Sequence, residues 1–267
     1  MPIIIKSDGE VQIMHESGKI LAAVLELVAA EVRPGLIMRK LDTIVAEEFR
    51  RRDVIPTFLG YHGFPAYVCV SVNDEIVHGI PGDRVLRDGE IVSIDLGNTH
   101  RGFVADSALT VGVGDIGPEE QRLIDVTNQS LWAGIRAARP GARIGEISNA
   151  IQTCAEAAGF SLVREYVGHG IGRDMHEDPS VPNFGPPDRG PVLRKGMVLA
   201  LEPMVTIGDW RTKKHDDQWT VSTLDGSLSA HFEHTIAITD GEPKVLTLRS
   251  DEQPLAATLV AAAEQRS

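Results

Sequence analysis

The stretch 91–106, IVSIDLGNTHRGFVAD, decides how the rest of the chain is interpreted. Its first part, Ile91 to Ile94, is β-branched and apolar, as in a buried strand. Turn-forming residues follow, and Phe103 to Ala105 begin a second extended run. A hairpin folded about its midpoint would set Asp95 opposite Asp106. Because facing carboxylates repel each other and are costly to bury, the stretch predicts a cation between them.

Length and composition exclude several classes of protein. A chain of 267 residues can form one large domain or two and bury a substantial core. Its formal net charge of −12 argues against general nucleic-acid binding and against docking on anionic membranes. Cys69 and Cys154 are too few for a disulfide framework, and neither a signal peptide nor a run of membrane-spanning length is visible. We therefore expect a soluble, cytoplasmic protein, and a monomer.

The spacing of apolar residues predicts helices and strands in two similar sets. A capping box at Ser7 and Glu10 begins the first helix, which continues past Val28. Further helices are predicted over Met38 to Arg52, Glu119 to Ala138 and Ile144 to Ala158. Strands are predicted over Tyr67 to Val72, Glu75 to Val77, Leu162 to Val167, Met197 to Leu201 and Phe232 to Ile238. Residues 56–65 and 178–191 are predicted loops, and the Ala-rich tail from Asp251 is a possible helix.

The two halves of the sequence repeat each other. Arg33-Pro34-Gly35 recurs as Arg139-Pro140-Gly141, each between two predicted helices. Leu86-Arg87-Asp88-Gly89 recurs at nearly the same interval as Leu193-Arg194-Lys195-Gly196, each before an apolar strand. We therefore predict an α/β (α+β) fold of two pseudo-symmetric halves, about 10–116 and 117–248, within one domain (1–250) followed by a tail (251–267).

The repeat also places acids at matching positions. The first strand of each unit ends on an acid, Asp95 or Glu202, and the next strand of each carries Asp106 or Glu233. Carboxylates with one imidazole suit Mn, Fe, Co or Zn. Four acids are too many for one catalytic ion with an open position, but they suit two ions about 3.5–4 Å apart, bridged by carboxylates and a hydroxide. Singly, each acid would more simply be a solvated strand end.

These residues together resemble the five-ligand signature of the methionine aminopeptidases. The signature consists of Asp95, Asp106, His169 in GHGIG, Glu202 in LEPM and Glu233 in FEHT. The resemblance runs from about Glu10 to Leu248 with the motifs in order, and it implies the duplicated "pita-bread" fold, an antiparallel sheet backed by helices. Type I is the better match, because the segment between His176 and Glu202 lacks the long helical insert of type II. The start at Met1 leaves no room for the zinc-binding extension of some type I relatives.

The resemblance implies a role for each ligand. Asp95 would chelate one ion, Asp106 and Glu233 would bridge both, and His169 with Glu202 would complete the other. Glu202 would also carry the proton of the bridging water. The ions implied are two divalent metals, with cobalt, manganese, iron and zinc all acceptable.

The resemblance also implies substrate contacts. His176 would polarise the scissile carbonyl and His78 would meet the scissile amide nitrogen, although both could instead be structural turn histidines. The methionine pocket would be lined by Phe58, Tyr61, Phe64, Cys69, Met175 and Trp219, since soft and aromatic groups suit a thioether. Many relatives carry Cys in place of Phe58 and Phe in place of Met175. His234, beside Glu233 in a strand, should face the other way and be structural.

The sequence therefore predicts a dinuclear-metal aminopeptidase that removes the N-terminal methionine from nascent proteins and peptides, preferring a small second residue. Its partners would be nascent N-termini, with the ribosome a further candidate. One alternative is an Xaa-Pro-directed peptidase of the same fold, although the segment before Glu10 is too short for the extra N-terminal domain usual there. Another is a non-catalytic binding protein on this fold, although such proteins lose ligands and all five are present here.

Overall fold

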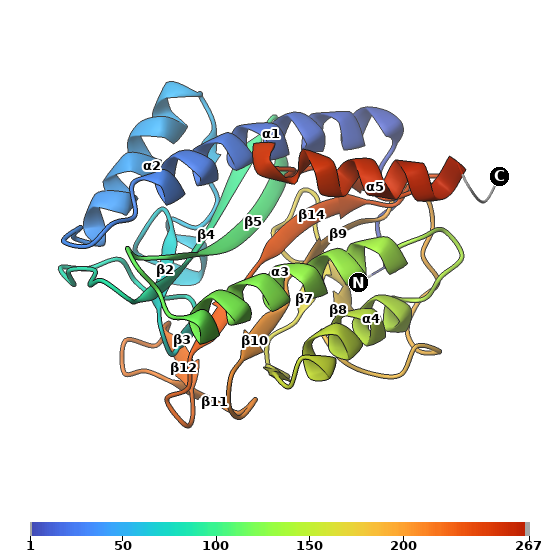
Figure 1. The fold of residues 1–267 in the computed structure, drawn as a ribbon. Coiled ribbons are helices and arrows are strands. Elements are labelled where there is room, and N and C mark those ends of the chain that lie inside the picture. Colours follow the sequence, from blue (N-terminus) through green and yellow to red (C-terminus); the bar gives the residue numbers. More distant parts are fainter. Residues whose placement is uncertain (1, 265–267) are drawn as a thin grey trace.

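A nine-stranded antiparallel sheet forms the centre of the molecule, and helices cover one of its faces (Figure 1). The structure is a computed structural model that describes residues 2–264, with side chains through Leu259. The helices are α1 (Asp8–Ala30), α2 (Arg39–Arg51), α3 (Pro118–Ala137), α4 (Ile144–Ala157) and α5 (Gln253–Glu264), with short 3-10 turns at Tyr61–Gly63 and Ser250–Glu252. The predicted duplicated fold, an antiparallel sheet backed by helices, is confirmed.

The strands are short except for the two of the opening hairpin. They are β1 (Ile55–Pro56), β2 (Cys69–Val72), β3 (Glu75–Val77), β4 (Ile91–His100), β5 (Phe103–Gly112), β6 (Ser161–Leu162), β7 (Gly168–Gly170), β8 (Glu177–Val181), β9 (Val198–Leu201), β10 (Met204–Thr206), β11 (Thr212–Lys214), β12 (Val221–Thr223), β13 (Ser229–His231), β14 (Glu233–Ala237) and β15 (Lys244–Val245). The central sheet has the order β1-β4-β5-β14-β9-β7-β8, with β2 also on β4 and β15 on β14.

Helix α1 begins where the sequence predicts it. Ser7 accepts a hydrogen bond from the backbone N–H of Glu10, and the Glu10 carboxylate accepts one from the backbone N–H of Ser7. Its buried residues recur at three- and four-residue spacing and pack on β4 and β5. Gly18 is required where α1 meets the segment after residue 245, because a β-carbon there would collide with the backbone carbonyl of Leu246.

The register of the β4–β5 hairpin corrects one prediction. Asp95 pairs with Ala108, and Asp106 pairs with Gly97, so the two acids are diagonal neighbours and not directly opposite. The turn lies one residue later than the midpoint, at Arg101-Gly102, where both residues have positive φ (51° and 78°). A two-residue turn of this kind matches the twist of the strands it joins. The shift keeps both acids on the same face.

The two halves make the same contacts around their Arg-Pro-Gly turns. The backbone N–H of Gly35 donates to Leu86 O at 2.8 Å, and that of Gly141 donates to Leu193 O at 3.0 Å. Both glycines have φ near +90°, which is favourable for glycine and strained for other residues. The two halves therefore repeat each other in backbone hydrogen bonding as well as in sequence.

The pseudo-twofold relation lies between β5 and β14. On one side β4 pairs with β5, and on the other β9 pairs with β14. The second pair is not a contiguous hairpin, because β10 to β13 are inserted between β9 and β14. These short strands form two small three-stranded sheets with β6 and β3. Each of these strands has only three residues, which is too few for an alternation of apolar and polar residues to be recognised in the sequence.

Two further boundaries differ from the sequence prediction. The strand predicted over Leu162 to Val167 is reduced to β6 at Ser161–Leu162, and β8 occupies the beginning of the loop predicted from residue 178. Pro179 within β8 argues against a strand, but β8 pairs only with β7 and lies at the sheet edge, where a missing N–H is tolerated.

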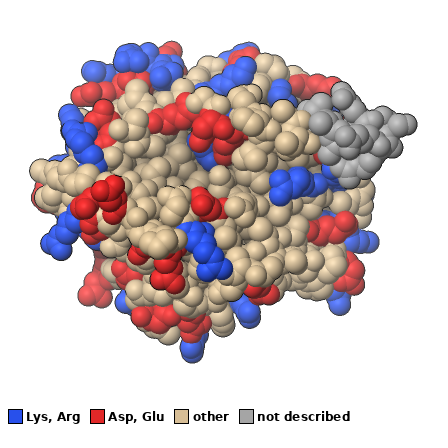
Figure 2. All heavy atoms as spheres, in the orientation of Figure 1, with Lys and Arg blue, Asp and Glu red and all other residues tan. Residues whose placement is uncertain are grey.

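The helix-covered surface carries acidic and basic side chains interspersed with one another (Figure 2). The C-terminal residues 253–264 form α5, which lies beside α1 (Figure 1). Among the described residues, no helix has both the length and the apolar composition needed to cross a membrane.

Candidate metal centre

Asp95, Asp106 and Glu233 lie on the face of the central sheet that is opposite the helices. Ala108 on β5 pairs with Asp95 on β4 and with Glu233 on β14, so the two acids flank one alanine. Paired residues in a sheet project to the same face, and so do residues two apart along a strand. Asp106, two residues before Ala108, therefore joins them. The residues that alternate with these acids along the strands, such as Ile94, point to the other face and belong to the main core under the helices.

The second half adds its two donors to the same face. His169 on β7 pairs with Ala200 on β9, which pairs with Thr235 on β14, two residues after Glu233. Glu202 lies two residues after Ala200, just beyond the end of β9. The strand period of two thus brings all five predicted ligands to one face.

Short distances connect the two halves of the cluster. His169 Nε2 lies 3.5 Å from Glu202 Oε1 and 3.9 Å from Asp106 Oδ2. One potential ligand atom from each of Asp106, His169 and Glu233 lies within 4.8 Å of the others. His169 Nδ1 is 2.9 Å from Gly170 O, and a carbonyl only accepts, so Nδ1 carries the hydrogen and Nε2 presents its lone pair to the acids.

The carboxylates show the electrostatic cost of this arrangement. Burial raises the pKa of Asp95 to about 7, and burial together with repulsion by Asp95 and Glu202 raises the pKa of Asp106 well above its usual value. The pKa values of Glu202 and Glu233 are raised well above the usual value for the same reasons.

Three of these buried oxygens lack a hydrogen-bond partner among the described residues: Asp95 Oδ1, Asp106 Oδ1 and Glu233 Oε1. Buried carboxylate oxygens are normally satisfied. A divalent cation satisfies and neutralises such oxygens together, and oxygen donors with one imidazole suit a hard or borderline ion. The residues present therefore fit a bound divalent metal.

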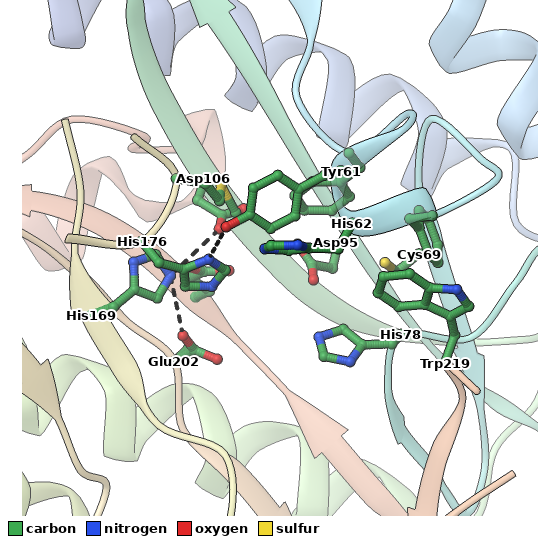
Figure 3. Close-up of a pocket in the computed structure, with 14 residues that line it drawn as sticks. Tyr61, His62, Cys69, His78, Asp95, Asp106, His169, His176, Glu202 and Trp219 are labelled. Atoms are coloured by element: carbon green, nitrogen blue, oxygen red, sulfur yellow. Dashed lines mark hydrogen bonds and ion pairs between the residues drawn. The ribbon is translucent and has the colours of Figure 1, made fainter. Parts of the chain in front are cut away.

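A cavity of about 230 Å³ opens onto the cluster (Figure 3). Figure 3 shows His169, His176 and Glu202 on one side and Cys69, His78 and Trp219 on the other. All thirteen predicted site residues line it: Phe58, Tyr61, Phe64, Cys69, His78, Asp95, Asp106, His169, Met175, His176, Glu202, Trp219 and Glu233. The structure brings together every residue that the sequence assigned to the site.

One lining residue, His62, has no counterpart among the sequence predictions. It adopts φ 48°, ψ 21° in the turn after Gly60, an unusual conformation for a residue with a side chain. Its ring stacks edge-on to Tyr61 at 4.4 Å. Its place in the motif Gly60-Tyr61-His62-Gly63, between two glycines, is the only sequence signal that would have suggested it.

Aromatic rings form the wall of the cavity away from the acids. Phe64 meets Phe58 edge-on at 6.4 Å and Trp219 edge-on at 5.1 Å. Trp219 lies in the β11–β12 loop, where the Asp217 carboxylate accepts hydrogen bonds from the backbone N–H groups of Trp219 and Thr220. The indole is therefore held by its own turn.

Two further histidines face the cavity in the neutral state. Burial, the neighbouring His176 and Lys214 lower the pKa of His78 to about 4. Desolvation and His62 lower the pKa of His176. The hydroxyl of Tyr61 is 2.7 Å from His176 Nδ1, and burial raises the tyrosine pKa, so this hydroxyl stays protonated and is able to donate.

His234 faces away from the cluster, as the strand alternation predicts. Its ring is fully buried, with Nδ1 2.9 Å from Thr247 Oγ1 and Nε2 3.0 Å from Glu252 Oε2. It holds the segment after β15 against the back of β14, which is a structural role.

Because Ala108 separates Asp95 from Glu233, its size should limit the room for a metal. Substituting Ala108→Val is expected to weaken binding of Mn²⁺ or Co²⁺ by about 10–100-fold, the range seen when the surroundings of metal ligands are altered. Isothermal titration calorimetry would measure this. The control is Ala105→Val, which is equally buried on β5 but faces the helices, so it overpacks the core without changing the metal site. Equal metal affinity in the two variants would contradict the prediction.

Comparison with known proteins places the chain in one family. Residues 12–240 match the model of "Metallopeptidase family M24". Over 92% of the chain it is 51% identical to the methionine aminopeptidase of Clostridium perfringens, covering 99% of that protein. It is 50% identical to methionine aminopeptidase 1 of Bacillus subtilis, with the same coverage of each chain.

Comparison with solved structures supports the same family assignment. Methionine aminopeptidase from Thermotoga maritima superposes with a TM-score of 0.91 at 45% identity, covering 92% of this chain and 99% of that one. A prolidase from Pyrococcus horikoshii, 21% identical with a TM-score of 0.72, shares the fold, and the match covers 64% of its length. These likenesses confirm the pita-bread fold predicted from the sequence. The chain therefore belongs to metallopeptidase family M24 and, within that family, to the methionine aminopeptidases.

Proposed function

We propose that this chain hydrolyses the N-terminal methionine from nascent proteins and peptides and prefers a small second residue. The observation that carries the proposal is a single cavity in which aromatic and sulfur-bearing side chains adjoin buried acids and His169. Soft and polarizable groups suit the methionine thioether, and the acids suit ions that activate water. The names of the relatives at about 50% identity support the same reaction.

Two divalent ions, drawn from cobalt, manganese, iron and zinc, would occupy the acid cluster. Four ionised carboxylates carry four negative charges in a buried site, which two divalent ions balance and one does not. When bound, the ions supply a nucleophile from water near neutral pH and stabilise charge on the substrate carbonyl. Asp95 would bind on one side, His169 and Glu202 on the other, with Asp106 and Glu233 between.

The chain's own side chains would act on the scissile bond. The Tyr61 hydroxyl would donate to His176 Nδ1, and the hydrogen of the neutral ring would then lie on Nε2. Nε2–H would donate to the carbonyl oxygen as charge develops there, and His78 would meet the amide nitrogen. Glu202, at the edge of the cluster, would pass the proton from water to the leaving amine.

The methionine side chain would lie among the aromatic rings. Phe64 and Trp219 close this part of the cavity with their edge-on contact, so a long unbranched side chain fits better than a bulky one. Phe58 and Met175 are both buried and apolar, which keeps the pocket suitable for methionine.

The second candidate function is cleavage of Xaa-Pro peptides, favoured by the fold shared with prolidase. A peptide panel separates the two. With chelator-treated protein and each metal added in turn, methionine release from Met-Ala-Ser is expected only with metal, and Met-Leu-Ser should be cleaved at least about tenfold more slowly, because one misfitting side chain costs roughly 1–3 kcal/mol. Cleavage of an Xaa-Pro peptide alone would refute the methionine assignment.

A further inference from the structure

A buried ion pair involves Glu177, which follows the cavity-lining residue His176 in the chain. Lys6 Nζ is 2.5 Å from Glu177 Oε2, and each side chain is only 3% exposed. The pair joins the segment before α1 to the first residue of β8. Burying two charges is costly even when they are paired, and a buried pair is only weak evidence for stability. Because Glu177 is next to His176, the pair also affects the loop that carries His176.

The carboxylate of Glu177 organises the loop Gly172 to Glu177. Glu177 Oε1 accepts hydrogen bonds from the backbone N–H of Arg173 at 2.9 Å and of Asp174 at 3.4 Å. The loop therefore closes around this side chain and carries Met175 and His176 into the cavity. Gly172 is needed in this arrangement, because a β-carbon there would collide with the Glu177 carboxylate and the Lys6 stem.

Lys6 is itself held by the backbone. Its N–H donates to Gly196 O at 2.8 Å, and its ammonium also donates to Ile4 O at 3.3 Å. Gly196 lies so close that a β-carbon would collide with the backbone of Lys6. The ammonium is thus a fixed anchor for Glu177 and not a flexible surface charge.

A second contact ties the outer end of the same loop to the same segment. The Arg173 guanidinium lies 4.3 Å from the centre of the Phe103 ring and 3.5 Å from Glu10 Oε1. Glu10 belongs to the capping box of α1 with Ser7. Residues 6–10 therefore hold the loop at both of its ends, through a buried pair and a surface pair.

We propose that Lys6, acting through Glu177, is a positioning residue for His176. The buried pair sets the backbone of the loop, and the Tyr61 hydroxyl sets the orientation of the imidazole ring. The two together aim His176 Nε2 at the carbonyl oxygen of the substrate. The inference rests on the proposed function, because it assumes that His176 acts on that carbonyl.

The test is Glu177→Gln in the metal-loaded full chain. The amide keeps the size of the side chain and an acceptor for the loop amides but loses the ion pair with Lys6. Since a displacement of about 1 Å costs up to about 100-fold in rate, kcat on Met-Ala-Ser should fall about 10–100-fold. Affinity for Mn²⁺ should change less than about twofold, because no metal donor contacts the pair.

The matched control is Glu242→Gln. Glu242 pairs with Arg139 at 2.8 Å, and its side chain is 11% exposed, away from the catalytic cavity. The same chemical change there should leave kcat within about twofold of the wild type. An equal fall of kcat in both variants, or no fall in Glu177→Gln, would overturn the proposal.

A double-mutant cycle separates positioning from general destabilisation. In a His176→Ala background, Glu177→Gln should lower kcat by less than about twofold, since the residue to be positioned is gone. A full second loss would overturn the proposal. Where Glu177→Gln alone does not fold, the neutral pair Lys6→Met with Glu177→Gln takes its place in the same cycle.

Failure of the proposed function is recognised separately. If the wild-type protein releases no methionine with any metal, positioning is still measured by the NMR signals of the His176 imidazole in the metal-free chain. These signals should shift in Glu177→Gln and stay unchanged in Glu242→Gln. Identical His176 signals in all three proteins would overturn the positioning role, whatever the reaction.

Discussion

Methionine release is expected to be lost when Asp106 is replaced by alanine. Asp106 lies on β5 at the junction of the halves, 3.9 Å from His169 Nε2 and diagonal to both Asp95 and Glu233. Changing groups that merely surround metal ligands costs about 10–100-fold, so removing a donor at the centre of the cluster should cost more than about 100-fold in kcat/KM. The assay is release of methionine from Met-Ala-Ser with Mn²⁺ or Co²⁺ added.

The same position offers a readout that does not depend on activity. Asp106→Asn removes one negative charge from a cluster whose acids repel one another. The metal-free variant should therefore have a higher free energy of unfolding near pH 8 than the metal-free wild type, and it should gain less stability when metal is added. Urea titrations with and without metal measure both quantities.

The control for these experiments is Asp125→Ala on the surface of α3, where the acid accepts a hydrogen bond from Gln121. This variant should keep wild-type turnover and wild-type stability gain on adding metal. Turnover that survives in Asp106→Ala after thorough chelation would exclude the metal mechanism.

The stability of the metal-free protein is expected to fall as the pH rises above about 6.5. Burial raises the pKa of Asp95 to about 7, and the pKa values of Asp106, Glu202 and Glu233 are also raised. In this range the unfolded chain has these carboxyls ionised while the native state still holds protons. Stability then decreases with pH, by up to about 1.4 kcal/mol per pH unit for each such proton.

The histidines determine where this window begins. Burial lowers the pKa of His78 to about 4 and of His169 to about 3, below the ordinary value of 6.5. Between those values the unfolded chain binds more protons at the histidines, so their contribution to stability rises with pH and opposes that of the acids. The histidine contribution fades as the unfolded imidazoles lose their protons, and about one pH unit above 6.5 the decline due to the acids dominates.

Urea unfolding of chelator-treated protein at pH 6.5, 7.5 and 8.5 measures the slope, because urea adds no ionic screening. The slope should be smaller in Asp95→Asn, which removes one of the titrating acids. Saturating metal should abolish it, since bound cations hold the acids ionised in the native state. Metal-free stability that is flat or rises over this range would contradict the raised carboxyl pKa values.

Local sequence signals were enough to predict the elements that depend only on nearby residues. The capping box at Ser7 and Glu10, the glycines that follow the two Arg-Pro-Gly turns and the apolar spacing of α1 to α4 all depend on neighbours within a few residues. The internal repeat added one long-range inference, that the acids of the two halves face a common place.

The errors arose where pairing depends on residues far away in the chain. The hairpin turn at Arg101-Gly102 lies one residue beyond the midpoint, because a two-residue turn with positive φ at both residues favours glycine, and this register places Gly102 in the turn. The strands β10 to β13 have three residues each, too few to show alternation, and only their partners make them strands. His62 reaches the cavity through a strained turn that composition does not reveal.

The sequence by itself determined the helices, the two-part repeat, the five candidate donors and the family that they resemble, because these features are carried by residue type and spacing. Only the tertiary structure decided the register that puts Asp95 and Glu233 on either side of Ala108, and the buried contact that brings Lys6 to Glu177. Such contacts join residues up to 171 positions apart. They exist only once the sheet has closed, since no local propensity encodes which distant partner fills a buried site.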